Sequence, residues 1–449
     1  SYIIVLCALV LVFGTLIEYY SIRYWSAEFD MISASLFSGA GFGDMGFRAM
    51  GFSPALLCEI DPKRTAFTKI NFPQAEVLTC DIAENVEKII DRINKILEQK
   101  KEDELFLLYA TPPCQGMSKN GIGSILKAMA DNKRPQIDKR NHLYLPVIDI
   151  VRSVKPKWIF FENVCRLFNF NDIDKNGKVE KITKIIENEF REIGYAGRFE
   201  QVQMADYGLP QTRLRSVGIF RLNEDRFFKK DESFIPKPTI KNPKHRITLR
   251  SVISKNEELI AIDPKKRMSS LNSLHRVPKW RDDLDFWMRN TPEGCSAFDN
   301  NTCLSCSFVN KKIDVKCTSC GSLLPKPVIV KNGEVKLIKG FVSAYKRMYW
   351  DKPASTITTR SAYACSDHKV HPSENRVLSI YEIAQLQGID IDEVIWKDST
   401  GKQFSDTLLR ELIGESVPPL FTKIVAKKIV EIEKARSTII NNKECFFTD

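Results

Sequence analysis

Short apolar runs that end in polar residues recur along residues 31–164, and segments with helical character separate them. The first unit, MISASLFSGAGFGDMGFRAMGF from Met31, predicts a strand, a tight turn that uses Gly39 and Gly41, and a helix. Repeated strand–helix–strand units form an open, doubly wound parallel sheet, whose ligands bind at the carboxyl ends of the strands. This pattern therefore predicts an α/β fold with its site at one edge of the sheet.

The polar residues at the ends of these runs are candidates for that site. SPALLCEIDP ends a strand at Glu59, whose carboxylate could accept hydrogen bonds from a ribose diol, and AEVLTCDI ends at Asp81. DELFLLYATPPCQG leads to Cys114, and KPKWIFFENV leads to Glu162 and Asn163. A single carboxylate at a strand end is usually part of an ion pair, but four polar strand ends in register predict a shared site.

Cys114 follows Pro112 and Pro113, which end the apolar run at residues 105–108. A cysteine at the rim of a sheet is either a small hydrophobic residue or a nucleophile. The local sequence leaves both alternatives open.

Arg213 and Arg215 lie two positions apart in YGLPQTRLRSVGIF. Because side chains alternate along a strand, we predict a strand that carries both arginines on one face. Such a pair could clamp a phosphate or a base edge, and a solvated pair on an exposed face is the alternative.

The net charge of +11 is concentrated in one part of the 449-residue chain. Residues 221–350 hold 26 Lys/Arg and 14 Asp/Glu, a net charge of +12, so the remainder is close to neutral. A chain of this length is long for one hydrophobic core, so we expect two domains. The charge distribution favours a polyanion-binding module joined to a neutral domain, and a solvated basic face is the alternative.

The basic segment contains CLSCSFVNKKIDVKCTSCG, in which ten residues separate two CxxC pairs. Paired CxxC motifs predict a structural zinc site, with redox-active pairs as the alternative. The predicted ligands are Cys303, Cys306, Cys317 and Cys320. Gly321 suits the tight knuckle after the last of them. The other cysteines are scattered, which fits reduced thiols in a cytoplasmic protein better than a disulfide framework.

Two further regions complete the pattern. Residues 1–30 include a mostly apolar run of sixteen residues from Tyr2 to Ile17, which is shorter than the roughly 20 residues of a membrane-spanning helix. We predict that residues 1–30 are an extension outside the folded domain, with a membrane anchor as the alternative. Residues 352–359, KPASTITT, predict a strand, and residues 375–389 predict an amphipathic helix with Leu378, Ile383 and Leu386 on one side.

Together these segments resemble the cytosine-5 DNA methyltransferases from Met31 to about residue 434. Seven motifs in the family's order carry the resemblance: residues 37–41, Pro113-Cys114-Gln115, DKRNHL from Asp138, Glu162-Asn163-Val164, Gln211 to Arg215, Arg376 to Gln387, and Gly414 to Pro419. The resemblance implies a doubly wound S-adenosylmethionine-dependent methyltransferase fold, with a smaller target-recognition domain that carries the zinc ribbon.

The resemblance also implies the chemistry. Cys114 would add to C6 of a flipped cytosine, which allows C5 to take a methyl group from S-adenosylmethionine. Glu162 would protonate or hydrogen-bond N3 and hold the amino group. Arg215 would contact O2, with Arg213 as a supporting contact.

For the cofactor, the resemblance implies that Glu59 binds the ribose, Asp81 binds the adenine amino group and Ile60 stacks on adenine. The full set of implied cofactor residues is Phe37, Gly39, Gly41, Glu59, Ile60, Asp81 and Pro112. The sequence departs from the family pattern at three positions. Phe42 replaces a glycine, Ser35 replaces a frequent aspartate, and Glu415 replaces an asparagine that contacts the cofactor.

We expect residues 31–220 to form the catalytic domain and residues 221–350 the target-recognition domain, with its zinc ribbon at residues 303–320. Residues 351–449 would return to the catalytic domain through a closing helix. The expected function is DNA cytosine-5 methylation in a restriction-modification system, by a cytoplasmic monomer that binds double-stranded DNA and no membrane.

Two alternative functions remain at this stage. A tRNA cytosine-5 methyltransferase would share the catalytic core, although the long basic insert suits a DNA-binding protein better. A catalytically inactive DNA-binding regulator would share the fold, although the intact Cys114 and Glu162 favour an enzyme.

Overall fold

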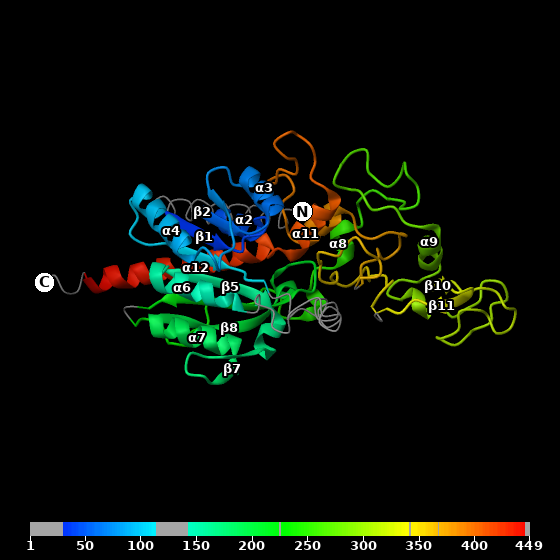
Figure 1. Cartoon of the computed structure of the whole chain (residues 1–449), viewed down its shortest axis with the longest axis horizontal. Coiled ribbons are helices and arrows are strands. Elements are labelled where there is room, and N and C mark those ends of the chain that lie inside the picture. Colours follow the sequence, from blue (N-terminus) through cyan, green and yellow to red (C-terminus); the bar gives the residue numbers. More distant parts are fainter. Residues whose placement is uncertain (1–29, 114–141, 224–225, 341–342, 367, 445–449) are drawn as a thin grey trace, which may run out of the picture. The chain divides into compact units, whose positions relative to one another are not determined.

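The computed structural model describes residues 30–113, 142–223, 226–340, 343–366 and 368–444 (Figure 1). The strands are β1 Met31–Leu36, β2 Phe52–Glu59, β3 Glu76–Thr79, β4 Leu107–Ala110, β5 Trp158–Val164, β6 Asn171–Ile173, β7 Val179–Lys181, β8 Tyr195–Gln203, β9 Leu214–Leu222, β10 Val328–Lys331 and β11 Glu334–Leu337. The helices are α2 Phe42–Arg48, α3 Pro62–Asn71, α4 Val86–Lys100, α6 Tyr144–Val154, α7 Ile182–Ile193, α8 Leu249–Ile253, α9 Asp282–Arg289, α10 Ile380–Leu386, α11 Asp406–Glu415 and α12 Pro419–Glu444. The predicted extension, apart from Asp30, lies outside the described residues.

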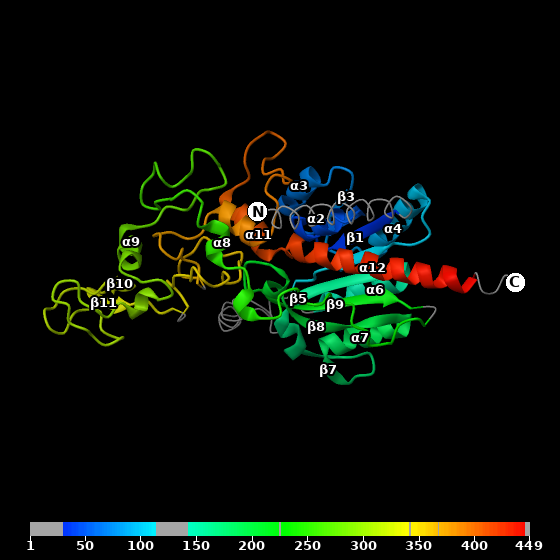
Figure 2. The ribbon, with the colours of Figure 1, turned by 180° about the vertical axis from the view of Figure 1, so that it is seen from behind.

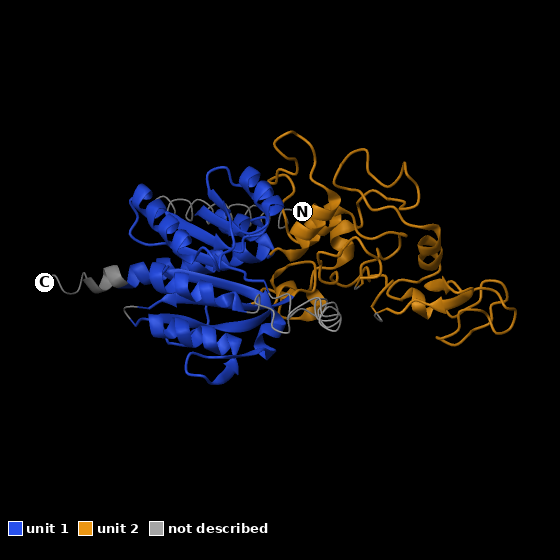
Figure 3. Cartoon of the chain, viewed as in Figure 1, with its two compact units in different colours: residues 1–202, 214–237, 417–449 blue, residues 203–213, 238–416 orange. Residues whose placement is uncertain are grey.

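The described residues form two compact units (Figure 3). The first unit runs up to Val202, continues over Leu214–Lys237 and resumes from Val417. The second unit comprises Gln203–Arg213 and Pro238–Ser416. The first unit contains the main sheet, and the second contains α8 to α11 and the β10–β11 hairpin.

The main sheet has seven strands in the order β3-β2-β1-β4-β5-β9-β8. Strands β1 to β5 pair in parallel, and β9 runs antiparallel to β5. From β1 the chain builds outward to β3 on one side and to β5 on the other, so the strand order reverses between β1 and β4. Ligands of open α/β sheets bind at such a switch point. The predicted α/β fold is confirmed.

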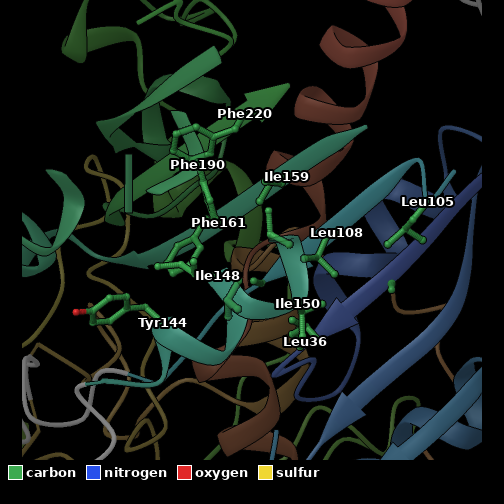
Figure 4. Close-up of a cluster of buried hydrophobic side chains, with 14 of the residues drawn as sticks. Leu36, Leu105, Leu108, Tyr144, Ile148, Ile150, Ile159, Phe161, Phe190 and Phe220 are labelled. Carbon is green, nitrogen blue, oxygen red and sulfur yellow. The ribbon is translucent and has the colours of Figure 1, made fainter. Parts of the chain in front are cut away.

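Successive residues of the central strands face opposite layers of helices. Leu108 and Phe161 belong to a buried cluster with side chains of α4, α6 and α7 (Figure 4). Tyr109 and Phe160 point the other way and contact Phe47 of α2, with ring centroids 5.6 and 5.7 Å apart. Because strand residues alternate between the two faces, a continuous apolar run such as residues 105–108 produces a sheet that is buried on both sides.

The closing helix α12 packs against α2 on one face of the sheet (Figure 2). The hydroxyl of Thr422 donates a hydrogen bond to the carbonyl of Gly43 at 2.7 Å. A Cβ atom at Gly46 would overlap the Thr422 hydroxyl and the carbonyl of Pro419. Glycine at position 46 therefore permits the close approach of the two helices.

A buried carboxylate joins α12 to the sheet. Glu433 Oε1 accepts hydrogen bonds from Trp158 Nε1 at 3.0 Å and from Arg221 Nε at 2.9 Å, and all three side chains are buried. The replacement Glu433→Ala leaves a buried guanidinium without its charge partner. We therefore expect it to lower the free energy of unfolding by about 3–5 kcal/mol.

Urea unfolding of the full chain measures this loss. The matched control is Glu431→Ala, because Glu431 is exposed on the same helix. The control is expected to change the free energy of unfolding by less than about 0.5 kcal/mol. An equal effect of the two replacements would show that the buried hydrogen bonds of Glu433 do not stabilise the unit.

The strand predicted over residues 352–359 is wrong. Only an isolated parallel bridge occurs in this segment, between Ala354 and Gln211. A side chain satisfies part of the backbone instead, since the amide of Ile357 donates to Gln211 Oε1 at 3.0 Å. The β-branched residues of the segment therefore adopt an extended course without a sheet.

The helix predicted over residues 375–389 is shorter than expected. Its helical part is α10, and Ser379 caps it. The Ser379 hydroxyl accepts from the Glu382 amide at 3.1 Å, and Glu382 Oε2 accepts from the Ser379 amide at 2.7 Å. This reciprocal capping box starts the helix after Leu378, which the prediction had placed on the helix face.

Within the described residues, the helices are too short or too polar to cross a membrane.

Candidate active site and cysteine cluster

The register of the parallel strands brings two of the predicted strand-end residues, Glu59 and Glu162, to one level. Leu36 of β1 pairs with Cys58 of β2 and with Ala110 of β4, and Ala110 pairs with Phe161 of β5. The residue that follows each of these paired positions along the chain therefore lies at the same carboxyl edge. These residues are Phe37, Glu59, Thr111 and Glu162.

Glu59 is buried at this edge, and backbone amides hold its carboxylate. Oε2 accepts from the amide of Gly39 at 3.0 Å, and Oε1 accepts from the amides of Ile60 and Asp61 at 3.0 Å each. The hydrogen bond from Gly39 links the end of β2 to the turn after β1, and all three fix the orientation of the carboxylate. Ile60, the next residue, is 60% exposed and offers an apolar surface beside it.

The turn after β1 has an uncommon backbone conformation. Phe37, Gly39 and Gly41 have φ angles of 59°, 55° and 73°, all in the left-handed region. For phenylalanine this region is strained, and such strain concentrates at functional sites. A Cβ atom at Gly41 would lie 2.5 Å from the ring of Phe72, and the Thr68 hydroxyl donates to the carbonyl of Gly39 at 2.9 Å. Thr68 of α3 and Phe72, the residue that follows α3, thus hold the turn in place.

Asp81 lies two residues beyond β3, and its Oδ1 accepts a hydrogen bond from the amide of Ala83 at 2.9 Å. Strand β3 is the outer neighbour of β2 and runs parallel to it, so Asp81 lies at the same edge of the sheet as Glu59.

Asn163 has a role that the sequence pattern did not reveal. Its Nδ2 donates to the carbonyl of Pro112 at 3.0 Å, and its Oδ1 accepts from the amide of Val164 at 2.8 Å. Asn163 therefore anchors the segment that leads to Cys114. The predicted nucleophile Cys114 itself lies outside the described residues, which end at Pro113 on this side.

Glu162 and Arg215 form an ion pair with 3.0 Å between Glu162 Oε1 and Arg215 Nε. In the antiparallel register Glu162 lies opposite Val217 and Arg215 opposite Val164, so the two side chains are diagonal neighbours on one face. Their side chains are only 9% and 15% exposed. The geometry is that of an acceptor and a donor group held side by side at the edge of the sheet.

Arg213 differs from Arg215, and the prediction that one strand carries both is wrong. Strand β9 begins at residue 214, after Arg213. The buried Arg213 guanidinium donates to the carbonyls of Ile357 at 3.1 Å, Gly414 at 3.4 Å and Ser416 at 2.7 Å. A guanidinium surrounded by backbone carbonyls positions the chain segments that supply them, so we assign Arg213 a positioning role.

The last motif packs tightly within the second unit. A Cβ atom at Gly414 would overlap the peptide between Thr358 and Thr359. Gln387 Nε2 donates to the carbonyl of Ser416 at 2.8 Å, and Gln211 Nε2 donates to Gln387 Oε1 at 2.7 Å. These side chains join three of the seven motifs, which are far apart in the sequence.

The four predicted zinc ligands lie together. All four sulfur atoms are within 4.8 Å of one another. The distances from Cys303 to Cys320 and from Cys306 to Cys317 are both 3.5 Å between sulfurs. A tetrahedral zinc ion with Zn–S bonds of about 2.3 Å separates its sulfur ligands by about 3.8 Å. The cluster therefore fits one tetrahedral ion.

The two halves of the cluster repeat one backbone geometry. The amide of Ser307 donates to the carbonyl of Cys303, and the amide of Gly321 donates to that of Cys317, at 2.9 Å in both cases. Ser307 and Gly321 have φ angles of 60° and 75°. Each CxxC pair is thus followed by a residue in the left-handed conformation, as the position of Gly321 had suggested.

The fold and the edge site define the class of the protein. The structure is similar to a crystal structure described as a DNA modification methyltransferase encoded within an E. coli prophage, at 20% identity. The match covers 90% of this chain and 100% of that chain, with a TM-score of 0.55. The two proteins therefore share an α/β fold with a central sheet.

The chain belongs to the C-5 cytosine-specific DNA methylase family, whose sequence profile matches residues 31–431. It is similar to the type II methyltransferase M1.HgaI of Avibacterium volantium, 30% identical over 386 residues that cover 83% of this chain and 90% of the relative. It is also similar to the type II methyltransferase M1.HphI of Haemophilus parahaemolyticus. The two are 26% identical over 387 residues, which cover 84% of this chain and 80% of the relative. The predicted family and the predicted enzyme, an S-adenosylmethionine-dependent DNA cytosine-5 methyltransferase, are confirmed.

The structure accounts for two of the departures from the family pattern. Phe42 is buried and packs on Phe67, with ring centroids 5.6 Å apart. Ser35 donates a hydrogen bond to Asp44 Oδ2 at 3.3 Å and so joins β1 to the buried carboxyl group of α2. Burial raises the pKa of Asp44 to about 8. Glu415 is the last residue of α11.

Proposed function

We propose that this enzyme methylates C5 of a cytosine that is flipped out of double-stranded DNA, as the modification enzyme of a restriction-modification system. The buried ion pair between Glu162 and Arg215 is the observation that carries the proposal. An acceptor and a donor at fixed separation match the polar edge of a cytosine, whose N3, amino group and O2 lie side by side.

Each side chain has one task in the proposed reaction. The thiolate of Cys114 forms a bond to C6, and negative charge develops on the ring towards N3 and O2. Glu162 donates a proton or hydrogen bond at N3, and Arg215 donates to O2, so both stabilise that charge. Asn163 holds Pro112 and thereby the segment that carries the thiol. The methyl group would come from S-adenosylmethionine. Loss of the proton from C5 then breaks the bond between sulfur and C6, which releases the methylated base and the thiolate of Cys114.

The edge between β1 and β2 is the proposed cofactor site. The Glu59 carboxylate, already oriented by three amides, would accept hydrogen bonds from the ribose hydroxyls. The exposed side chain of Ile60 would stack on the adenine, and Asp81 would accept from its amino group. The left-handed turn at Gly39 and Gly41 would bring its backbone close to the methionine part of the cofactor.

The basic segment at residues 221–350 is the proposed target-recognition domain, and its cysteine cluster is the proposed structural zinc site. The net charge of +12 suits the phosphates of DNA. The two relatives described above are type II methyltransferases, and the family is one of DNA methylases, which favours DNA over tRNA as the substrate. Sequencing the methylated cytosines in DNA from cells that express the full chain would identify the target sequence.

The replacement Glu162→Gln tests the assignment of the base contact. Glutamine keeps the size of the side chain but removes the charge that pairs with Arg215 and the ability to protonate N3. We expect kcat for methyl transfer to fall at least about 100-fold. Cofactor affinity, measured by titration with S-adenosylmethionine, should change little because Glu59 and its amides are untouched.

The control is Glu192→Gln, which neutralises an exposed acid of the same unit. It should leave kcat unchanged. If Glu162→Gln retains more than about a tenth of the wild-type kcat, Glu162 does not act on the base in the proposed way.

A further inference from the structure

Two cysteines without a role in methyl transfer lie beside the proposed cofactor site. Cys58 precedes Glu59 at the end of β2, and Cys80 precedes Asp81 just after β3. Each thiol is therefore one residue away from a proposed cofactor ligand. Cys58 is buried and Cys80 is partly exposed.

The sheet brings the two thiols together. Glu59 pairs with Thr79 in the parallel register, and the amide of Cys80 donates to the carbonyl of Glu59 at 3.0 Å. The backbone thus continues the β2–β3 ladder up to Cys80. Both side chains pack against the same buried cluster under α4. Cys58 pairs with Leu78, so Cys80, two residues further along, is its diagonal neighbour on the same face of the sheet.

The environment makes the two thiols chemically different. The hydrogen bond with Cys58, assisted by the charge of Lys88, lowers the pKa of Cys80 to about 7. The same contact and burial raise the pKa of the Cys58 thiol. Near neutral pH a large share of Cys80 is thiolate, the reactive form, and a neutral thiol lies next to it. This is the arrangement of an oxidisable cysteine and its resolving partner.

We propose that Cys58 and Cys80 form a disulfide when they react with a hydroperoxide, and that this disulfide weakens binding of S-adenosylmethionine. The Cys80 thiolate attacks the peroxide oxygen, the O–O bond breaks, and a sulfenic acid and an alcohol (water from hydrogen peroxide) result. The Cys58 sulfur then attacks the sulfenic acid sulfur and water leaves. Two thiols and one hydroperoxide are converted to one disulfide, one alcohol and one water.

The effect on the cofactor follows from the position of the bond and rests on the proposed function. A disulfide holds its sulfurs about 2.05 Å apart, which is closer than two hydrogen-bonded thiols. Closing this distance pulls on the end of β2, where Glu59 lies, and on the residues just after β3, where Asp81 lies. Loss of one hydrogen bond between the Glu59 carboxylate and the ribose corresponds to about a tenfold or larger loss of affinity. We therefore expect the dissociation constant of S-adenosylmethionine to rise at least about tenfold.

Mass spectrometry of the full chain tests the disulfide. The protein, reduced and then treated with hydrogen peroxide, is alkylated at its free thiols and digested with trypsin. Trypsin cleaves after Lys63, Arg64 and Lys69, so the disulfide joins two separate peptides. We expect the linked pair in the wild type and in the control Cys365→Ser, which removes an exposed thiol of the second unit.

Two variants test the order of events. In Cys58→Ala the sulfenic acid at Cys80 has no resolving thiol, so we expect a dimedone adduct on Cys80. In Cys80→Ser we expect Cys58 to stay reduced. Failure to detect the linked peptides, or oxidation of Cys58 in the absence of Cys80, would overturn the proposal.

Titration with S-adenosylmethionine tests the consequence. Peroxide should weaken binding to the wild type, dithiothreitol should restore it, and Cys58→Ala should keep its affinity after peroxide. If the linked peptides form and the affinity stays constant, the effect on the cofactor is refuted. If the reduced protein does not bind the cofactor, the proposed function fails, while the linked peptides still report on the thiol pair.

Discussion

The replacement Cys114→Ser is expected to abolish methyl transfer, with a loss of at least about a thousandfold in kcat. A serine hydroxyl has a far higher pKa than a thiol, so almost no anionic nucleophile exists near pH 7. Binding of S-adenosylmethionine should persist, because Glu59 and the turn at Gly39 belong to strands that this replacement leaves intact.

DNA that carries 5-fluorocytosine at the target distinguishes loss of the nucleophile from misfolding. Fluorine at C5 cannot leave as a proton does, so the bond between sulfur and C6 persists and a covalent complex accumulates. We expect this complex with the wild type and with the control Cys365→Ser, and none with Cys114→Ser. A complex attached to a different cysteine would contradict the proposed mechanism.

The double replacement of Cys317 and Cys320 by serine is expected to remove about one zinc ion per chain and to unfold the cysteine cluster. Structural zinc contributes about 10–16 kcal/mol to the folding of small zinc-binding peptides, so the local effect should be large. Specific binding of DNA should weaken, because the cluster lies in the proposed target-recognition domain. The affinity for S-adenosylmethionine should hardly change, since its proposed ligands lie in the first unit.

Metal analysis and two titrations, one with DNA and one with the cofactor, check this result. The control is Cys295→Ser, which removes a cysteine of the same unit that is not part of the cluster. It should keep the zinc and both affinities. Purified wild-type protein without zinc, or an equal loss of both affinities in the double variant, would exclude the proposed role.

The edge of the sheet was predictable because local sequence determines where a buried strand ends. Apolar runs that stop at Glu59 and Glu162 place those residues at or near strand ends, since β2 ends at Glu59 and β5 ends two residues after Glu162. Parallel strands bring such ends to one edge. The cysteine cluster was predictable for a similar reason. Two CxxC pairs fold into two local turns, and little more than the ten intervening residues is needed to bring them together.

Predictions that treated a segment in isolation were less accurate. The β-branched residues at 352–359 favour a strand locally, but Gln211 satisfies part of that backbone and no sheet forms. The helix periodicity extended beyond the true start of α10, because a capping box at Ser379 decides where the helix begins. In both cases a side-chain hydrogen bond overrides the pattern.

By itself the sequence determined the fold class, the polar strand ends and the four cysteines that cluster, because periodicity, strand termination and CxxC spacing are local properties. Only the tertiary structure decided which side chains meet. The pairing of Glu162 with Arg215 depends on the antiparallel register of β5 and β9, and the contact of Asn163 with Pro112 joins residues 51 apart. The two arginines of one motif received different tasks because Arg213 is enclosed by carbonyls from distant segments, and such long-range contacts leave no periodic trace in a single sequence.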